Sequence, residues 1–296
     1  MANPNPGADK GTNFSQTGVI ECGQQILNLN QPVVMGILNI TQDSFFDGGR
    51  YLTNESIIDR AGRMLEEGAS IIDIGAVSTR PGSAGVSAEA EIQQLIPAIE
   101  ILRKNYPEAI ISADTYRSAT AEMAIEAGAG IINDVSGGTM DEKMIGFIAD
   151  TNAAYVLMHI QGTPENMQVN PVYSDVTKEV SGFFRERLDF FESKGKQNII
   201  LDPGFGFGKN LEHNYRLLAD IRYFKDMGYA VLAGVSRKSM INKVLKTTAA
   251  EALNGTSIIN TIALLNGASI LRVHDVKEAM EAIKLTETYL SINNIK

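Results

Sequence analysis

The sequence is poor in cysteine and histidine, and its acidic residues outnumber its basic ones. A single cysteine, Cys22, among 296 residues excludes an internal disulfide and a cysteine-based metal site, and fits the reducing cytoplasm. The three histidines include no His-x-His pair, which argues against a metal-dependent hydrolase barrel. A net charge of -9 argues against a nucleic-acid-binding surface.

Long hydrophobic runs are also missing. No stretch is apolar over enough residues to cross a bilayer, and the N-terminus lacks the charged-then-apolar pattern of a signal peptide. Residues 1–18 are rich in Asn, Pro, Gly, Ser and Thr, a composition that predicts a disordered leader. Residues 19–296, without a linker-like break, are predicted to form one domain.

Short apolar runs alternate with segments of helical periodicity along this domain. Strands are predicted near 33–38, 71–74, 110–113, 130–132, 154–158, 198–201, 230–234 and 269–273. Helices are predicted at 55–67, 88–104, 118–127, 177–194, 214–227, 250–266 and 276–290, with the weakest at 141–150. Eight strand–helix units in this length predict an α/β fold, a single (β/α)8 TIM barrel. A doubly wound sheet is the alternative, and residues 19–32 are expected to form a short hairpin at the barrel bottom.

Polar residues follow every predicted strand. Because the C-terminal ends of barrel strands converge on one face, these side chains are expected to share a site. A single polar residue after a strand is explained by ordinary helix capping. Polar residues at the ends of all eight strands instead indicate a functional site. In chain order they include Asn39, Asp73, Asp114, Asn133, His159, Asp202, Lys238, Arg272 and His274.

One stretch stands out among these strand ends, the segment 202–209 with the sequence DPGFGFGK. Its alternating glycines allow a close approach of the backbone to a flat ligand, and its two phenylalanines can stack on one. The glycine spacing matches neither a Walker A loop nor a dinucleotide fingerprint. A glycine-rich connector with a capping Asp202 is the alternative interpretation.

The strand-end residues fall into two chemical sets. Asp114, Asn133, Asp202 and Lys238 provide acceptors and donors that suit the edge of a heteroaromatic ring with amino and keto groups. Arg80, Arg272 and His274 could hold a diphosphate, and Asn39 could reach its Mg²⁺. The alternatives are a helix cap for Asp114, a turn former for Asn133, and a surface ion pair with Asp275 for Arg272 and His274. His159 is expected to pack or hydrogen-bond locally.

Several motifs together carry a family resemblance. They are Met35–Thr41 with Asp43–Phe45, Ser78–Gly82, Asp202–Lys209, Ser236–Ser239 and Arg272–Asp275. In this order and spacing they resemble the dihydropteroate synthases over essentially residues 20–290. The resemblance implies a transferase of folate biosynthesis. Such an enzyme condenses 6-hydroxymethyl-7,8-dihydropterin diphosphate with 4-aminobenzoate, giving 7,8-dihydropteroate and diphosphate.

The resemblance also implies roles for individual residues. Asp114, Asp202, Lys238 and Arg272 would carry catalysis, by a dissociative substitution at the pterin methylene. The pterin would be bound by Asp114, Asn133, Met158, Asp202, Gly206, Phe207 and Lys238. The 4-aminobenzoate region would comprise Phe45, Thr79, Arg80, Pro81, Lys238 and Ser239. The diphosphate would be bound by Asn39, Asp43, Arg80, Arg272 and His274, with Asn39 as the protein ligand of Mg²⁺.

Further expectations follow from the same resemblance. The enzyme would be a cytoplasmic homodimer with small-molecule substrates, inhibited competitively by sulfonamides, and without nucleic-acid or membrane partners. Apolar positions on the last helices, such as Ile258, Ile262, Leu265 and Ile283, are compatible with a dimer interface and equally with helix-to-barrel packing. Two other functions stay open: a pterin-binding methyltransferase that passes a methyl group from a folate to a corrinoid, and a non-catalytic pterin-binding protein.

Overall fold

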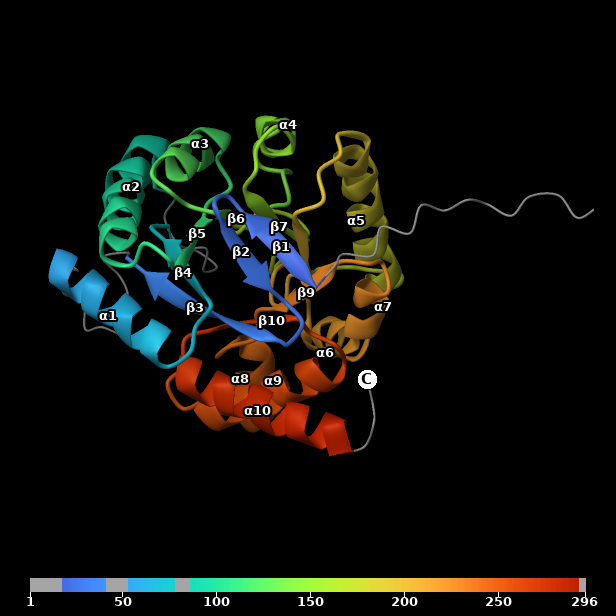
Figure 1. Cartoon of the computed structure of the whole chain (residues 1–296). Helices are drawn as coiled ribbons and strands as arrows, with labels where there is room; N and C mark the ends of the chain where they lie inside the picture. Colours follow the sequence, from blue (N-terminus) through green and yellow to red (C-terminus); the bar gives the residue numbers. More distant parts are fainter. Residues whose placement is uncertain (1–17, 41–52, 78–85, 293–296) are drawn as a thin grey trace, which may run out of the picture.

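A computed structural model describes residues 18–40, 53–77 and 86–292. Eight parallel strands close into a barrel in the order β10-β3-β4-β5-β6-β7-β8-β9, with the helices outside (Figure 1). The closed order confirms the predicted TIM barrel and excludes a doubly wound sheet. The strands are β3 (Val33–Asn39), β4 (Ile71–Gly75), β5 (Ile110–Asp114), β6 (Ile131–Asp134), β7 (Ala154–Met158), β8 (Ile199–Asp202), β9 (Ala230–Ala233) and β10 (Ile270–Val273).

The helices follow the predicted pattern with two differences. They are α1 (Asn54–Glu66), α2 (Ala88–Asn105), α3 (Ser118–Glu126), α4 (Lys143–Ala149), α5 (Val176–Ser193), α6 (Leu211–Ala219), α7 (Ile221–Lys225), α8 (Ser239–Leu245), α9 (Leu253–Leu265) and α10 (Val276–Ile292). The single helix predicted over 214–227 is wrong, because the chain breaks into α6 and α7 at Asp220. The short helix α8 was not predicted.

The predicted N-terminal hairpin is present and covers the barrel bottom. Strands β1 (Val19–Cys22) and β2 (Gln25–Asn28) pair antiparallel across that end of the barrel (Figure 1). Ile20, Cys22 and Leu27 pack against the first residues of the barrel strands, such as Ile71 and Ile131. This apolar layer closes the end of the barrel opposite the polar strand ends, so the hairpin serves stability and the other end is left for a site.

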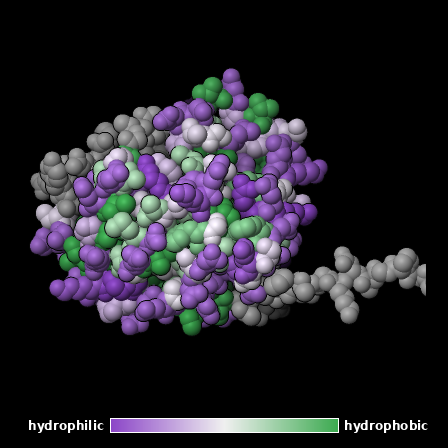
Figure 2. Space-filling view, turned by 90° about the horizontal axis from the view of Figure 1, so that it is seen from above, coloured by the Kyte–Doolittle hydropathy of each residue, from purple (hydrophilic) through white to green (hydrophobic). Residues whose placement is uncertain are grey.

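Two further findings concern the surface and the ends of the chain. Within residues 18–40, 53–77 and 86–292, no helix is both long and apolar enough to cross a membrane. On the face seen in Figure 2, purple hydrophilic residues surround smaller green hydrophobic areas. All but the last residue of the predicted leader 1–18 lie outside the described residues.

Candidate active site

Four strands bring residues of their C-terminal ends to the same level of the barrel. Asn39 on β3 pairs with Gly75 on β4, Gly75 pairs with Asp114 on β5, and Asp114 pairs with Asn133 on β6. A Cβ on Gly75 would lie 3.6 Å from Asn39 Oδ1 and 3.6 Å from Asp114 Oδ2. The missing side chain therefore leaves room between the amide and the carboxylate.

Arg272 links this row of strand ends to the strand that closes the barrel. Its Nε donates to Asp73 Oδ2 at 2.7 Å, and its Nη2 donates to Asp114 Oδ2 at 2.7 Å. Asp73 also accepts hydrogen bonds from Ser112 Oγ at 2.6 Å and Asn133 Nδ2 at 3.1 Å. The completely buried Asp73 thus orients both Arg272 and Asn133.

The negative charge of Asp114 is only partly compensated by its neighbours in this cluster. Its burial raises the pKa of its carboxyl to about 7, although the positive charge of Arg272 acts in the opposite direction. One guanidinium faces two buried carboxylates, Asp73 and Asp114. The cluster therefore holds a carboxyl group that changes its protonation near neutral pH.

Asp202 and Lys238 form the opposite side of the site. Gly234, at the end of β9, separates them, since a Cβ there would lie 3.7 Å from Lys238 Nζ and 3.8 Å from Asp202 Oδ2. Burial raises the pKa of Asp202 and lowers the pKa of Lys238 to about 8, and each charge partly offsets the effect of burial on the other. A carboxylate and an ammonium thus face the same space.

The segment Asp202–Lys209, called the pterin loop below, begins at the last residue of β8 and requires its glycines. Gly204, Gly206 and Gly208 have φ angles of +73°, +83° and +62°. L-residues rarely adopt this conformation. In addition, a Cβ on Gly204 would collide with the carbonyl oxygen of His159. The alternating glycines predicted to bring the backbone close to a ligand therefore serve first to form this turn.

Phe207 and Met158 provide the apolar surface of the site. Both belong to a small cluster with Val135, Ile160 and Met167. Lys238 Nζ lies 4.7 Å from the centre of the Phe207 ring and donates to the Phe205 carbonyl oxygen. The Lys238 stem also borders Gly206, whose Cβ would lie 3.3 Å from Lys238 Cδ. A flat ligand in this space would meet both an aromatic face and a cation.

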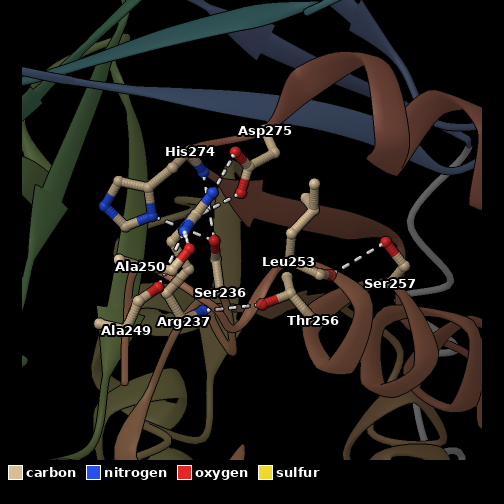
Figure 3. A network of polar contacts seen from close by, with 9 residues as sticks. All are labelled: Ser236, Arg237, Ala249, Ala250, Leu253, Thr256, Ser257, His274 and Asp275. Atoms are coloured by element: carbon tan, nitrogen blue, oxygen red, sulfur yellow. Dashed lines mark hydrogen bonds and ion pairs between the residues drawn. The ribbon is translucent and has the colours of Figure 1, made fainter. Parts of the chain in front are cut away.

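The loops after β9 and β10 are tied together by polar contacts (Figure 3). Ser236 Oγ lies 3.0 Å from His274 Nδ1 and accepts from the His274 backbone N–H at 3.3 Å. Arg237 forms a two-pronged pair with Asp275, with both distances 2.8 Å. The alternative pairing of Asp275 with Arg272 or His274 is therefore not formed: Asp275 pairs with Arg237, and Arg272 with Asp73 and Asp114. Burial lowers the pKa of His274 to about 4, so its ring is neutral at pH 7.

The structure gathers some predicted site residues and leaves others undescribed. Asn39, Asp114, Asn133, Met158, Asp202, Gly206, Phe207, Lys238, Arg272 and His274 all stand at or just after the C-terminal ends of the barrel strands. Ser239 is exposed at the first position of α8. Asp43, Phe45, Thr79, Arg80 and Pro81 lie outside the described residues.

Sequence reasoning missed two buried residues of this region. Neither Asp73, on its strand, nor Lys209, at the end of the segment 202–209, receives a role from the sequence. A charged residue inside an apolar strand is the signal that could have marked Asp73, since an ion is seldom buried unless it is paired. Lys209 lies well beyond β8, so this signal does not apply to it. His159, expected to bond locally, does so with Lys209 Nζ at 3.1 Å.

The arrangement suits a flat, polar heterocycle that carries an anionic group. Acceptors lie at Asp114, Asn133 and Asp202, and Arg272 provides a positive charge between them and His274. Within the described parts of the chain no cluster of three His, Cys, Asp or Glu side chains could hold a metal ion.

Comparison with known proteins agrees with this geometry. The family model described as "Pterin binding enzyme" matches residues 35–274. The dihydropteroate synthase of Escherichia coli strain K12 is 44% identical over 275 residues, which cover 91% of this chain and 96% of that protein. The dihydropteroate synthase of Haemophilus influenzae is 39% identical, covering 88% of this chain and 94% of that protein.

Solved structures give the same result. A Yersinia pestis dihydropteroate synthase in complex with a sulfonamide drug has a TM-score of 0.87 and 39% identity, covering 92% of this chain and 99% of that one. The Xanthomonas albilineans enzyme in complex with 7,8-dihydropteroate has a TM-score of 0.80 and 32% identity, covering 93% and 99%. The barrel, its polar strand ends and these relatives lead to one conclusion: the chain belongs to the dihydropteroate synthase family of pterin-binding enzymes.

Proposed function

We propose that the protein catalyses the condensation of 6-hydroxymethyl-7,8-dihydropterin diphosphate with 4-aminobenzoate, forming 7,8-dihydropteroate and diphosphate. The observation that carries this proposal is the ring of Asp114, Asn133, Asp202 and Lys238 around one space, with Arg272 beside it. A transferase of folate biosynthesis needs these groups together: hydrogen bonds for the pterin edge and positive charge for the departing anion.

The pterin ring would be held between the two sides of the barrel. Asp202 and Asp114 accept hydrogen bonds from its amino and ring N–H groups, and Asn133 can both donate and accept. Phe207 and Met158 would cover its faces, close to Gly206. Lys238, which already borders the Phe207 ring, would donate to a keto or ring nitrogen acceptor.

The reaction is proposed to begin at the pterin methylene group. The C–O bond breaks with its electron pair leaving on the diphosphate, and the dihydropterin ring delocalises the resulting positive charge. Asp114 and Asp202 stabilise that charge, while Arg272, His274 and Arg80 stabilise the anion. The amine of 4-aminobenzoate then forms the C–N bond and loses a proton, without an activated nucleophile on the protein.

Asn39 fits the magnesium ion that such a diphosphate would bring. Its amide Oδ1 lies beside the open space at Gly75, and Mg²⁺ in proteins is held by few protein oxygens together with waters and phosphates. Asp43 would add a carboxylate on the diphosphate side. When bound, the ion would neutralise charge on the leaving group.

The 4-aminobenzoate site is proposed at Phe45, Thr79, Arg80 and Pro81, together with Lys238 and Ser239. Ser239 begins α8 directly after Lys238, so it stands next to a residue of the pterin site. Sulfonamides resemble 4-aminobenzoate in their arylamine group and would compete for this site. Relatives crystallised with 4-aminobenzoic acid and with a sulfonamide drug support these two classes of ligand.

The two other functions receive less support from the residues. A folate–corrinoid methyltransferase would share the Asp and Asn contacts to the pterin, but it has no use for a diphosphate set. A non-catalytic pterin-binding protein would not need Arg272 and Lys238 in place, and both are present with ordered partners. We therefore favour the synthase.

The protein is also proposed to form a homodimer through α9 and α10. Ile258, Ile262 and Leu265 on α9 are exposed, and so are Leu285, Tyr289 and Ile292 on α10. Both sets have the spacing i, i+4, i+7, which forms one apolar stripe on each helix, and the two helices lie side by side (Figure 1). Ile283, in contrast, packs into the core, so helix-to-barrel packing is its role. Exposed stripes on neighbouring helices favour association.

The function is tested by diphosphate release from the purified protein. With pterin diphosphate and Mg²⁺, release is expected to increase when 4-aminobenzoate is added and to decrease when a sulfonamide is added as well. Tight binding of the pterin without turnover would contradict the synthase and favour one of the two alternatives. The single cysteine and the small-molecule substrates fit a cytoplasmic enzyme.

A further inference from the structure

Lys209, the residue that ends the pterin loop, is a buried cation outside the predicted substrate contacts. It is only 3% exposed. Its Nζ lies 3.1 Å from His159 Nδ1, 3.1 Å from the His159 carbonyl oxygen and 2.9 Å from the Phe207 carbonyl oxygen. An ammonium group has three N–H donors, so each donor finds one acceptor. Such a group is well placed to fix backbone geometry.

The bond to Phe207 belongs to a series along the pterin loop. Five consecutive carbonyl oxygens, from Phe205 to Lys209, each accept a hydrogen bond from a side chain. In chain order the donors are Lys238, Gln168, Lys209, Tyr173 and Asn214. A loop with three glycines in the left-handed region is free to adopt many conformations when unfolded, and these bonds select one of them.

Among these donors, Lys209 alone bridges the loop to the strand beside it. It joins the Phe207 carbonyl to the His159 carbonyl, and His159 directly follows β7. Gly204 lies between them, since a Cβ there would be 3.2 Å from Lys209 Nζ. Gly204 N–H donates to Asp202 Oδ1 at 2.7 Å. Lys209 thus contacts the backbone of Phe207, and it lies beside Gly204, whose N–H donates to the carboxylate of Asp202.

We propose that Lys209, through its contact with His159, is a positioning residue that holds Phe207 and Asp202 of the pterin loop in place for the pterin. The inference rests on the proposed pterin site. Lys209 acts through its backbone contacts and does not touch the substrate. It differs in this from Lys238, which faces the pterin space itself.

The charges around Lys209 act on its protonation, and the proposed role belongs to its ammonium form. Burial lowers the pKa of Lys209 to about 7; the charge of Asp202 opposes this effect, and that of Lys238 adds to it. Burial also lowers the pKa of His159 to about 3, with the charge of Lys209 adding to the effect, so the ring is neutral and its Nδ1 can accept from the ammonium. Tyr173 and Phe183 pack around His159 and keep its ring in place.

The experiment compares two buried lysines at opposite ends of the barrel. Lys196 is 5% exposed and donates to the carbonyl oxygens of Thr151 and Ala153 at 2.7 and 2.5 Å, next to the N-terminal hairpin. Lys209→Met and Lys196→Met each remove one buried ammonium while keeping most of the side-chain volume. The full chain is used, and the probe is 6-hydroxymethyl-7,8-dihydropterin without diphosphate, titrated calorimetrically well below each variant's unfolding temperature.

Both variants are expected to unfold at a lower temperature than the wild type. Lys209→Met is also expected to bind the pterin about tenfold or more weakly, because a charge-assisted network around the loop is lost. Lys196→Met is expected to bind it as the wild type does. A substitution that acted only through stability would leave the pterin affinity of the folded protein unchanged in both variants.

Variants at His159 test the same contact without changing the lysine. His159→Asn keeps an acceptor near the position of Nδ1 and is expected to retain most of the affinity, whereas His159→Leu is expected to lose affinity as Lys209→Met does. If Lys209→Met does not fold, the two His159 variants decide the question, together with Tyr173→Phe. The last removes the donor to Gly208 O and should weaken pterin binding to a smaller extent.

The possible outcomes separate the two proposals. A wild-type protein that does not bind the pterin contradicts the proposed function. A wild-type protein that binds it, with a folded Lys209→Met that binds equally well, contradicts the role of Lys209 alone. Equal losses in Lys209→Met and Lys196→Met, or equal affinities of the two His159 variants, would also contradict that role.

Discussion

At the scale of single residues, the site is a set of buried charges that do not balance in pairs. Arg272 serves two carboxylates, Asp73 and Asp114, and Asp73 in turn holds Asn133. Removal of one partner from such a network leaves the others buried and unpaired, which is costly. The network therefore fixes the positions of Asp114, Asn133 and Arg272 relative to one another.

Substitutions at Asp202 and Arg272 test the proposed charges directly. Asp202→Asn and Arg272→Ala are each expected to reduce turnover at least about a hundredfold, since removing one preorganised charge costs that much in well-studied enzymes. Steady-state diphosphate release is the measurement, and circular dichroism shows whether the variants are folded. Turnover near the wild-type rate in either folded variant would contradict its assignment.

The pH dependence of pterin binding follows from Asp114, Lys209 and Lys238. Because burial raises the pKa of Asp114 to about 7, its carboxylate form grows as the pH rises through that value. Affinity for the pterin without diphosphate is expected to increase over this range, because only the ionised form of Asp114 can accept hydrogen bonds with both of its carboxylate oxygens. It should decrease again at higher pH as Lys209 and Lys238 lose their protons, because burial lowers the pKa of Lys209 to about 7 and the pKa of Lys238 to about 8.

Asp114→Asn is the control for this profile. An amide does not titrate, so the increase near pH 7 should be missing while the decrease at higher pH persists. The measurement is calorimetric titration from pH 5.5 to 9.5. If the affinity of Asp114→Asn still increased near pH 7, the increase would be due to a group other than Asp114.

The sequence predicted which polar residues stand at the strand ends better than it predicted the residues that support them. Asp114, Asn133 and Asp202 lie at the C-terminal ends of their strands, so the barrel pattern alone placed them together. The roles of Asp73 and Lys209 depend on which side chains meet across the barrel, at separations as long as that between Asp73 and Arg272. Periodicity along the chain carries no information on such pairings.

At the scale of elements, the barrel divides its tasks between its two ends. The hairpin β1–β2 packs on the lower, apolar layer. The predicted substrate residues that are described lie at the upper ends of strands or in the loops after them, apart from Ser239, which begins α8. Gly130 approaches the hairpin so closely that a Cβ would collide with the Cys22 carbonyl oxygen. Stability and activity should therefore respond separately to substitutions.

Leu27 in the hairpin tests this separation. Leu27→Ala removes a side chain that is 2% exposed and should lower the free energy of unfolding by about 2–5 kcal/mol. Its neighbour Ile26 is 67% exposed, and Ile26→Ala should change stability by less than about 0.5 kcal/mol. Urea denaturation measures both. Turnover per folded molecule should stay at the wild-type level, and a large loss in Leu27→Ala would show that the two ends are coupled.

Some boundaries of elements could not be predicted from periodicity. The apolar pattern continues from α6 into α7, yet the helix breaks at Asp220. The Asp220 carboxylate accepts from Thr177 Oγ1 at 2.6 Å and from Arg216 Nε at 2.7 Å, so contact with the start of α5 fixes this residue. The short α8 similarly ends at Lys246 in the left-handed conformation, where the sequence offers no glycine.

At the scale of the whole molecule, the proposed dimer places its interface on α9 and α10. Ile258→Glu puts a charge into the apolar stripe of α9 and is expected to shift the protein toward monomers, because a charge is costly to bury without a partner. Met123→Glu on α3, also an exposed apolar residue, is the control and should leave the assembly unchanged. Sedimentation velocity at several concentrations measures the shift; a wild-type monomer would contradict the dimer.

The proposed dimer interface is connected to the active site, because α9, which carries one of the two apolar stripes, contacts the loop that carries Lys238. Arg237 has a φ of +55° and is held by Asp275, by the carbonyl oxygens of Ala249 and Ala250, and through its backbone N–H by Thr256 of α9 (Figure 3). The loop that carries Lys238 is therefore anchored on the helix that would face the second subunit.

Gly75 gives the open space between Asn39 and Asp114 a further meaning. A methyl group at this position would sit at ordinary contact distance from both neighbours, so Gly75→Ala should fold without strain. The methyl group would nevertheless fill part of the space between Asn39 and Asp114 that the proposed ligand occupies. The side chain would act as an inhibitor that is covalently part of the protein. Gly75→Ala is therefore expected to have normal stability and an increased KM for the pterin diphosphate.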